Sequence, residues 1–154
     1  MRTILSEKEI MIKRNGSAHW EGGLLDGNGT VSTASGVLSK TQYSFKTRFE
    51  SGVGTNPEEL IAAAHAGCFS MALSKQLEDA GMKAQSIDTI ATVSFDKVDG
   101  GFSITDIHLD LTAKIPGGDK AKFEQAAANA KAGCPISKLF KGNTNVTLDA
   151  KLAG

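Results

Sequence analysis

The feature that most constrains the fold is a long helical segment over about residues 57–80. Asn56 can cap this segment, and Pro57 suits its first turn, where a missing N–H does no harm. Gly81 follows as a typical stop signal. Over residues 60–73 the segment is apolar on almost every side, which is typical of a helix buried over most of its surface. We therefore predict a central, buried helix.

Strand patterns lie on both sides of the predicted helix. Before it, β-branched and alternating residues between glycine-rich turns indicate three strands, one between residues 9 and 20, one over 30–35 and one over 42–49. After it, two alternating segments, 87–98 and 102–115, are joined by Asp99-Gly100-Gly101. This pattern predicts a long hairpin.

The last third of the chain adds two helices and one strand. In chain order we expect a helix opened by residues 116–119 and ended by Gly133, a short helix over about 135–141, and a strand over 145–152. Strands and helices thus come in separate blocks, which indicates the α+β class with mainly antiparallel sheets. Because no linker or repeat is visible and 154 residues is the size of one domain, we predict a single domain over residues 1–154.

Charge and hydropathy exclude several kinds of partner. Seventeen basic residues balance seventeen acidic ones, so we expect neither nucleic acid nor an anionic membrane surface as a partner. Charged residues interrupt the N-terminal segment where an export signal needs an unbroken apolar run, and the longest apolar stretch, 60–68, is too short to span a membrane. We therefore expect a cytoplasmic protein.

The chain has two cysteines, Cys68 in the predicted central helix and Cys134 just before a proline. In a reducing compartment, paired thiols tend to be catalytic, redox-sensing or metal-binding. The histidines stand singly and no CxxC spacing occurs, so we expect no zinc site and no cofactor. Cys68 alone is also compatible with a small buried hydrophobe. Cys134 alone is compatible either with a turn residue or with a thiol activated by a helix start. Together they make a reversible two-thiol cycle a reasonable hypothesis.

Arg48 and Glu58 could supply the charges that such a site needs. A guanidinium can stabilise a thiolate, and a carboxylate can hold that guanidinium by two parallel hydrogen bonds. The alternatives are a solvated strand residue for Arg48 and compensation of the helix dipole for Glu58.

Helix geometry separates Glu58 from Cys68 within one chain. Ten helical residues rise ~15 Å, so the two side chains cannot meet along one straight helix. A two-fold homodimer with the central helices side by side would bring Glu58 and Arg48 of one chain to the thiol of the other. Three small residues of the helix would permit this close packing: Ala63, Ala64 and Gly67.

Two long motifs carry a family resemblance. Residues 55–73, TNPEELIAAAHAGCFSMAL, and residues 131–137, KAGCPIS, closely resemble the OsmC/Ohr family of thiol peroxidases, and its osmotically inducible OsmC branch in particular. The resemblance implies an OsmC-like fold in an intertwined homodimer that reduces organic hydroperoxides to alcohols. It implies that Cys68 is the peroxidatic thiolate and Cys134 the resolving thiol, with Arg48 and Glu58 as the activating ion pair. An external dithiol, such as a lipoyl group on a carrier protein, would recycle the disulfide without metal, haem or flavin.

Two other functions remain open at this point. One is a non-enzymatic dimeric module that binds a small apolar molecule, with both thiols inert. The other is a redox sensor that forms the same disulfide, although no DNA-reading motif supports it. His65, three residues before Cys68, could act as a base for the thiol, but its position favours a packed or interface histidine.

Overall fold

The computed structural model describes residues 11–154. The start of the first predicted strand, at Glu9 and Ile10, and most of the segment considered as an export signal lie outside the described residues. The chain divides into two compact units, Met1–Asn56 and Pro57–Gly154.

The N-terminal unit contains a small antiparallel sheet. Its strands are β1 (Gly16–Glu21), β2 (Asn28–Thr33) and β3 (Thr41–Tyr43), in that order across the sheet. Trp20 of β1 packs against Tyr43 of β3, with ring centroids 5.4 Å apart. The three strands expected in this region are therefore present.

The third of these strands is shorter than expected, because residues 45–49 form the short helix α1 (Phe45–Phe49). Ser44 and Thr47 build a reciprocal capping box, in which each backbone N–H donates to the other side-chain oxygen, at 3.2 and 2.9 Å. Phe45 and Phe49 then meet one helical turn apart, with ring centroids at 4.7 Å. The alternation over 42–49 suggested a strand, but local capping decides the structure. Arg48 thus lies on a helix, not on a strand.

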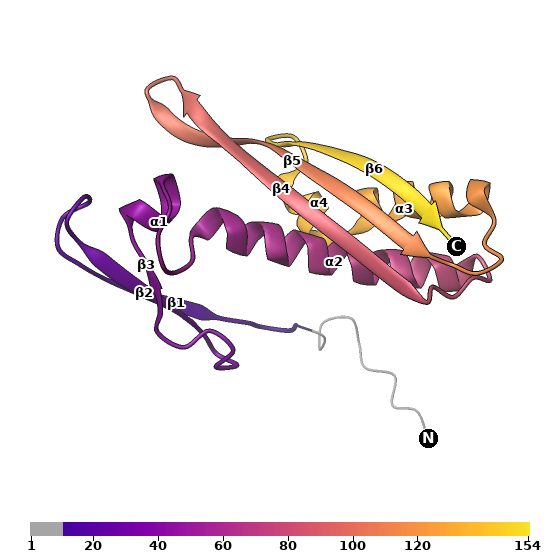
Figure 1. Ribbon diagram of the computed structural model, residues 1–154, viewed down its shortest axis with the longest axis horizontal. Coiled ribbons are helices and arrows are strands. Elements are labelled where there is room, and N and C mark those ends of the chain that lie inside the picture. The colour runs from indigo at the N-terminus through magenta and orange to yellow at the C-terminus, as the bar shows by residue number, and fades with distance from the viewer. Residues whose placement is uncertain (1–10) are drawn as a thin grey trace. The chain divides into compact units, whose positions relative to one another are not determined.

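The C-terminal unit contains the long helix and the long hairpin that the sequence predicts. In chain order its elements are α2 (Pro57–Asp79), β4 (Ser86–Val98), β5 (Gly101–Lys114), α3 (Lys120–Gly133), α4 (Pro135–Phe140) and β6 (Asn145–Ala153). β4, β5 and β6 form one sheet, and the helices pack on one of its faces (Figure 1). None of the helices within residues 11–154 is long and apolar enough to cross a membrane.

This sheet is mixed, but three of the four pairings between the described strands are antiparallel, in keeping with the expectation of mainly antiparallel sheets. β4 and β5 are antiparallel, joined by Asp99 and Gly100 at φ 51° and 83°, the left-handed backbone that a tight hairpin turn requires. β6 runs parallel to β5, from Asp106 opposite Asn145 to Lys114 opposite Ala153. The two helices between β5 and β6 form a crossover, so the chain re-enters the sheet in the same direction.

The core lies between the sheet and the helices. α2 contributes one stripe of fully buried side chains four residues apart, namely His65, Phe69, Leu73 and Leu77. The sequence predicted that α2 is buried on most sides, but only this one stripe of the helix is buried within the single chain. Met71 is 78% exposed, and a Cβ added at Gly67 would meet no atom of the described residues within 4 Å. The second apolar face of α2 thus lies open in the single chain.

Truncating one side chain on each face of the sheet should distinguish the buried face from the exposed one by the loss of stability. Leu109 of β5 is fully buried, whereas Ile90 of β4 is 68% exposed on the outer face. Leu109→Ala should lower the free energy of unfolding by about 2–5 kcal/mol because it leaves a cavity, and Ile90→Ala by no more than about 0.5 kcal/mol. Equilibrium denaturation in urea measures both changes, and equal losses in the two variants would contradict this assignment of the core.

Candidate active site

The two cysteines meet in the C-terminal unit. Cys68 lies on α2 and Cys134 lies in the turn between α3 and α4, and their sulfur atoms are 2.8 Å apart despite a sequence separation of 66 residues. Both are free thiols. Cys134 is fully buried, whereas Cys68 is partly exposed. The pair therefore joins a partly exposed cysteine to a buried one.

The turn at Cys134 follows from its neighbours in sequence. Cys134 ends α3, where its N–H donates to the Ala130 carbonyl at 2.9 Å, and it is also the N-cap residue of α4. Its ψ of 128° is the extended geometry that a residue before a proline prefers. Its side chain makes no capping hydrogen bond to α4, so the contact between this sulfur and the helix start, one of the two alternatives for Cys134, is absent. The sulfur is directed at Cys68 instead.

Among the described residues, the groups around Cys68 raise the pKa of its thiol on balance. Burial raises the pKa of Cys68, and contact with Cys134 raises it further because two thiols this close cannot both ionise. A hydrogen bond from the Ile136 backbone N–H, in the first turn of α4, acts in the opposite direction and lowers the pKa. The balance favours the protonated thiol. A nucleophilic thiolate at Cys68 needs a further positive charge.

His65 is packed in the core, as its position in the sequence suggested. Its ring is fully buried, and Nε2 is 2.8 Å from the hydroxyl of Ser137, which is 7% exposed. Its ring centroid is 5.9 Å from that of Phe140. Burial lowers the pKa of His65, so the ring is neutral near pH 7.

Glu58 lies on α2 but away from the two sulfurs. It occupies the first turn of the helix, and its side chain is only 6% exposed. Ten residues of the same helix separate it from Cys68, a rise of ~15 Å. The structure therefore does not bring Glu58 and Cys68 of one chain together.

Arg48 belongs to the N-terminal unit, where it borders an aromatic hollow of about 170 Å³. Its guanidinium carbon lies 5.4 Å from the ring centroid of Phe49, a cation–π distance. The other residues of this hollow are Trp20, Leu24, Tyr43, Ser44 and Phe45. Sequence reasoning missed this hollow, because its rings come from separate segments that only the fold brings together.

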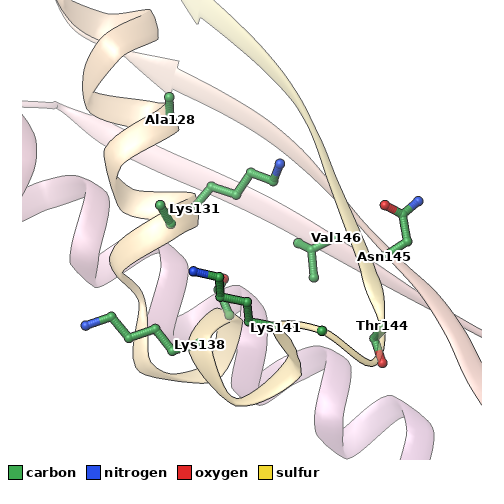
Figure 2. A pocket seen from close by; sticks show the side chains of 10 residues that line it. Ala128, Lys131, Lys138, Lys141, Thr144, Asn145 and Val146 are labelled. Carbon is green, nitrogen blue, oxygen red and sulfur yellow. The ribbon is translucent and has the colours of Figure 1, made fainter.

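A larger hollow in the C-terminal unit does not contain the thiols. It measures about 380 Å³ and lies between α3, α4 and β6, with neither cysteine in its lining. Figure 2 shows Lys131 reaching over it towards β6, while Lys138 points away. Of the residues described near the cysteines, namely His65, Ile136, Ser137 and Phe140, only Ser137 lines this hollow. The two thiols therefore lie outside this hollow.

Comparisons with known proteins agree on one family. The family model described as OsmC-like protein matches residues 50–149. The chain is 55% identical over 143 residues to Peroxiredoxin OsmC of Escherichia coli (strain K12), covering 93% of this chain and 99% of that protein. It is 32% identical over 124 residues to the organic hydroperoxide resistance protein OhrB of Bacillus subtilis (strain 168), covering 80% and 89%. A crystal structure of an organic hydroperoxide resistance protein from Elizabethkingia anophelis superposes with a TM-score of 0.74 at 26% identity, covering 94% and 99%.

The geometry of the cysteines makes a prediction that needs no peroxide. Oxidation of the reduced protein by diamide should link Cys68 to Cys134 within one chain, because the two sulfurs are already 2.8 Å apart. Intact mass should fall by two hydrogens, and peptide mapping should find the Cys68–Cys134 pair. Cys134→Ala is the control and should show no intramolecular link. Disulfides formed only between chains would contradict the geometry.

Proposed function

The chain belongs to the OsmC family, and on this premise we propose that it is a thiol peroxidase that reduces organic hydroperoxides to alcohols. The observation that carries the proposal is the meeting of the chain's two cysteines, since the sulfur of the partly exposed Cys68 lies 2.8 Å from that of the buried Cys134. The names of the relatives, peroxiredoxin and organic hydroperoxide resistance protein, support the same chemistry.

Cys68 is the attacking residue in this proposal, since it is the more exposed of the two thiols. Its thiolate attacks the outer oxygen of the hydroperoxide and the O–O bond breaks. The alkoxide that leaves takes up a proton and departs as the alcohol. Cys68 is oxidised to a sulfenic acid.

Cys134 then resolves the sulfenic acid. Its sulfur forms a bond to the Cys68 sulfur, and the hydroxyl of the sulfenic acid leaves with the Cys134 proton as water. An external dithiol reopens the disulfide by two exchange steps and is itself oxidised to a disulfide. The net reaction turns one hydroperoxide and one dithiol into alcohol, water and disulfide. We assign it to the cytoplasm, where dithiols are kept reduced, with a lipoyl-type dithiol as the reductant class.

Activation of Cys68 requires a second copy of the chain. In the single chain the pKa of Cys68 is raised, and Glu58 lies ~15 Å away along α2. We place Arg48 of the partner chain beside the thiolate, held by the partner's Glu58, in a homodimer with two such sites. The open apolar face of α2, formed by Ala63, Ala64, Gly67 and Met71, supports this arrangement. In this proposal the two units together form one OsmC-like domain over residues 1–154, because each contributes a residue to the site.

The aromatic hollow beside Arg48 favours an apolar substrate. Alkyl or aryl groups gain about 0.8 kcal/mol for each methylene removed from water. A hydroperoxide with a hydrocarbon tail can fill such a hollow, and hydrogen peroxide cannot. Organic hydroperoxides should therefore be the better substrates.

A peroxidase assay tests the proposed function. With dihydrolipoamide as reductant, cumene hydroperoxide should be consumed at least about tenfold more efficiently than hydrogen peroxide, because burial of its ring favours the bound state. Cys68→Ser should abolish turnover. A wild-type protein that consumes no peroxide would overturn the proposal. Turnover retained in Cys68→Ser would show that the reaction does not use this thiol.

A mixed dimer tests whether the site is shared between chains. Arg48→Met and Cys68→Ser should each be inactive as homodimers. A purified heterodimer that combines one chain of each has one site with both an intact arginine and an intact thiol, so about half of the wild-type activity should return. If the heterodimer remains inactive, Arg48 does not reach the thiol of the partner chain. Wild-type activity in the Arg48→Met homodimer would remove Arg48 from the site altogether.

A further inference from the structure

A buried hydrogen bond links α2, which carries Cys68, to α4, which begins directly after Cys134. His65 precedes Cys68 by three residues on α2, and Ser137 follows Cys134 by three residues on α4. His65 Nε2 and Ser137 Oγ are 2.8 Å apart, and the two residues are 0% and 7% exposed. The thiol mechanism described above uses neither side chain.

The direction of this hydrogen bond follows from the other nitrogen of the ring. Nδ1 is buried and has no hydrogen-bond partner within the described part of the chain. A proton on Nδ1 would leave a buried donor unpaired, whereas a proton on Nε2 can be donated to Ser137. Because burial also lowers the pKa of His65, the ring is neutral and carries one proton. His65 Nε2–H therefore donates to Ser137 Oγ.

α4 depends on such a contact for its position. The helix has six residues, too few to be stable without packing, and the side chain of its N-cap residue, Cys134, makes no capping hydrogen bond. Its apolar residues Ile136 and Phe140 pack against the core, but apolar contact is not directional. The hydrogen bond to His65 is directional and costly to break, because breaking it leaves the N–H of a fully buried ring without a partner. It fixes where α4 lies along α2.

We propose that His65 and Ser137 are positioning residues, which hold α4 against α2 so that Cys134 captures the Cys68 sulfenic acid before a second hydroperoxide does. This inference rests on the proposed function, since the capture step exists only if peroxide oxidises Cys68. The sulfenic acid has two fates. Condensation with the Cys134 thiol gives the disulfide and water. Attack on a second hydroperoxide breaks another O–O bond and gives a sulfinic acid and a second alcohol.

Four variants separate this role from general loosening of the fold. Ser137→Ala and His65→Leu both remove the hydrogen bond. His65→Gln keeps an amide N–H near the position of Nε2 and should preserve it. Ser70→Ala is the matched control, because it removes a 2.7 Å hydrogen bond from the same helix to Thr89 of β4 and leaves α4 untouched.

The experiment measures the two steps separately. Stopped-flow kinetics gives the rate of the first reaction with cumene hydroperoxide, and intact mass with peptide mapping after excess peroxide gives the ratio of sulfinic acid to disulfide. In Ser137→Ala and His65→Leu the ratio should rise about tenfold or more, because small misplacement of reacting groups slows a step strongly. The first step should change by no more than about twofold. His65→Gln and Ser70→Ala should resemble the wild type in both readouts.

The outcomes distinguish this inference from the proposed function. If the wild type forms no disulfide with peroxide, the proposed function fails and the positioning role fails with it. If the wild type forms the disulfide and Ser137→Ala gives the same ratio of sulfinic acid to disulfide, only the positioning role is overturned. If the ratio of sulfinic acid to disulfide rises in Ser70→Ala as much as in Ser137→Ala, the positioning role is also overturned. Should His65→Leu not fold, as judged by circular dichroism, Ser137→Ala decides the question.

Discussion

The contact between two sulfur atoms, one on α2 and one at the turn from α3 to α4, is the interaction on which the proposed chemistry depends. The turn combines the end of α3 at Gly133, the extended backbone imposed by Pro135 and a short helix packed against α2. These features place the buried Cys134 2.8 Å from Cys68. A thiol pair in this arrangement can pass between reduced and disulfide forms with little movement of the backbone.

A second constraint comes from helix geometry. Because α2 is one continuous helix, its first turn and Cys68 are separated by ~15 Å, and no rotamer of Glu58 spans that distance. Burial raises the pKa of Cys68, which favours the protonated thiol. The proposed partner chain would meet both needs at once, since it would cover the open apolar face of α2 and bring Arg48 to Cys68.

The sequence predicted the elements whose signals are long and local. The capped segment of α2 and the alternating hairpin of β4 and β5 were expected close to their observed bounds, because periodicity over many residues leaves few alternatives. α1 was missed because the capping box of Ser44 and Thr47 outweighs a short alternating pattern. The direction of β6, the aromatic hollow at Arg48 and the bond between His65 and Ser137 arise from contacts between distant segments. No local pattern encodes such contacts.

The most direct test of the central claim, that Cys68 is the residue oxidised by peroxide, is to trap its sulfenic acid. In Cys134→Ser the sulfenic acid cannot be resolved, so one equivalent of cumene hydroperoxide in the presence of dimedone should label Cys68 in peptide mapping. The alcohol should appear in equal amount. No dimedone adduct on Cys68, with the hydroperoxide left intact, would contradict the claim.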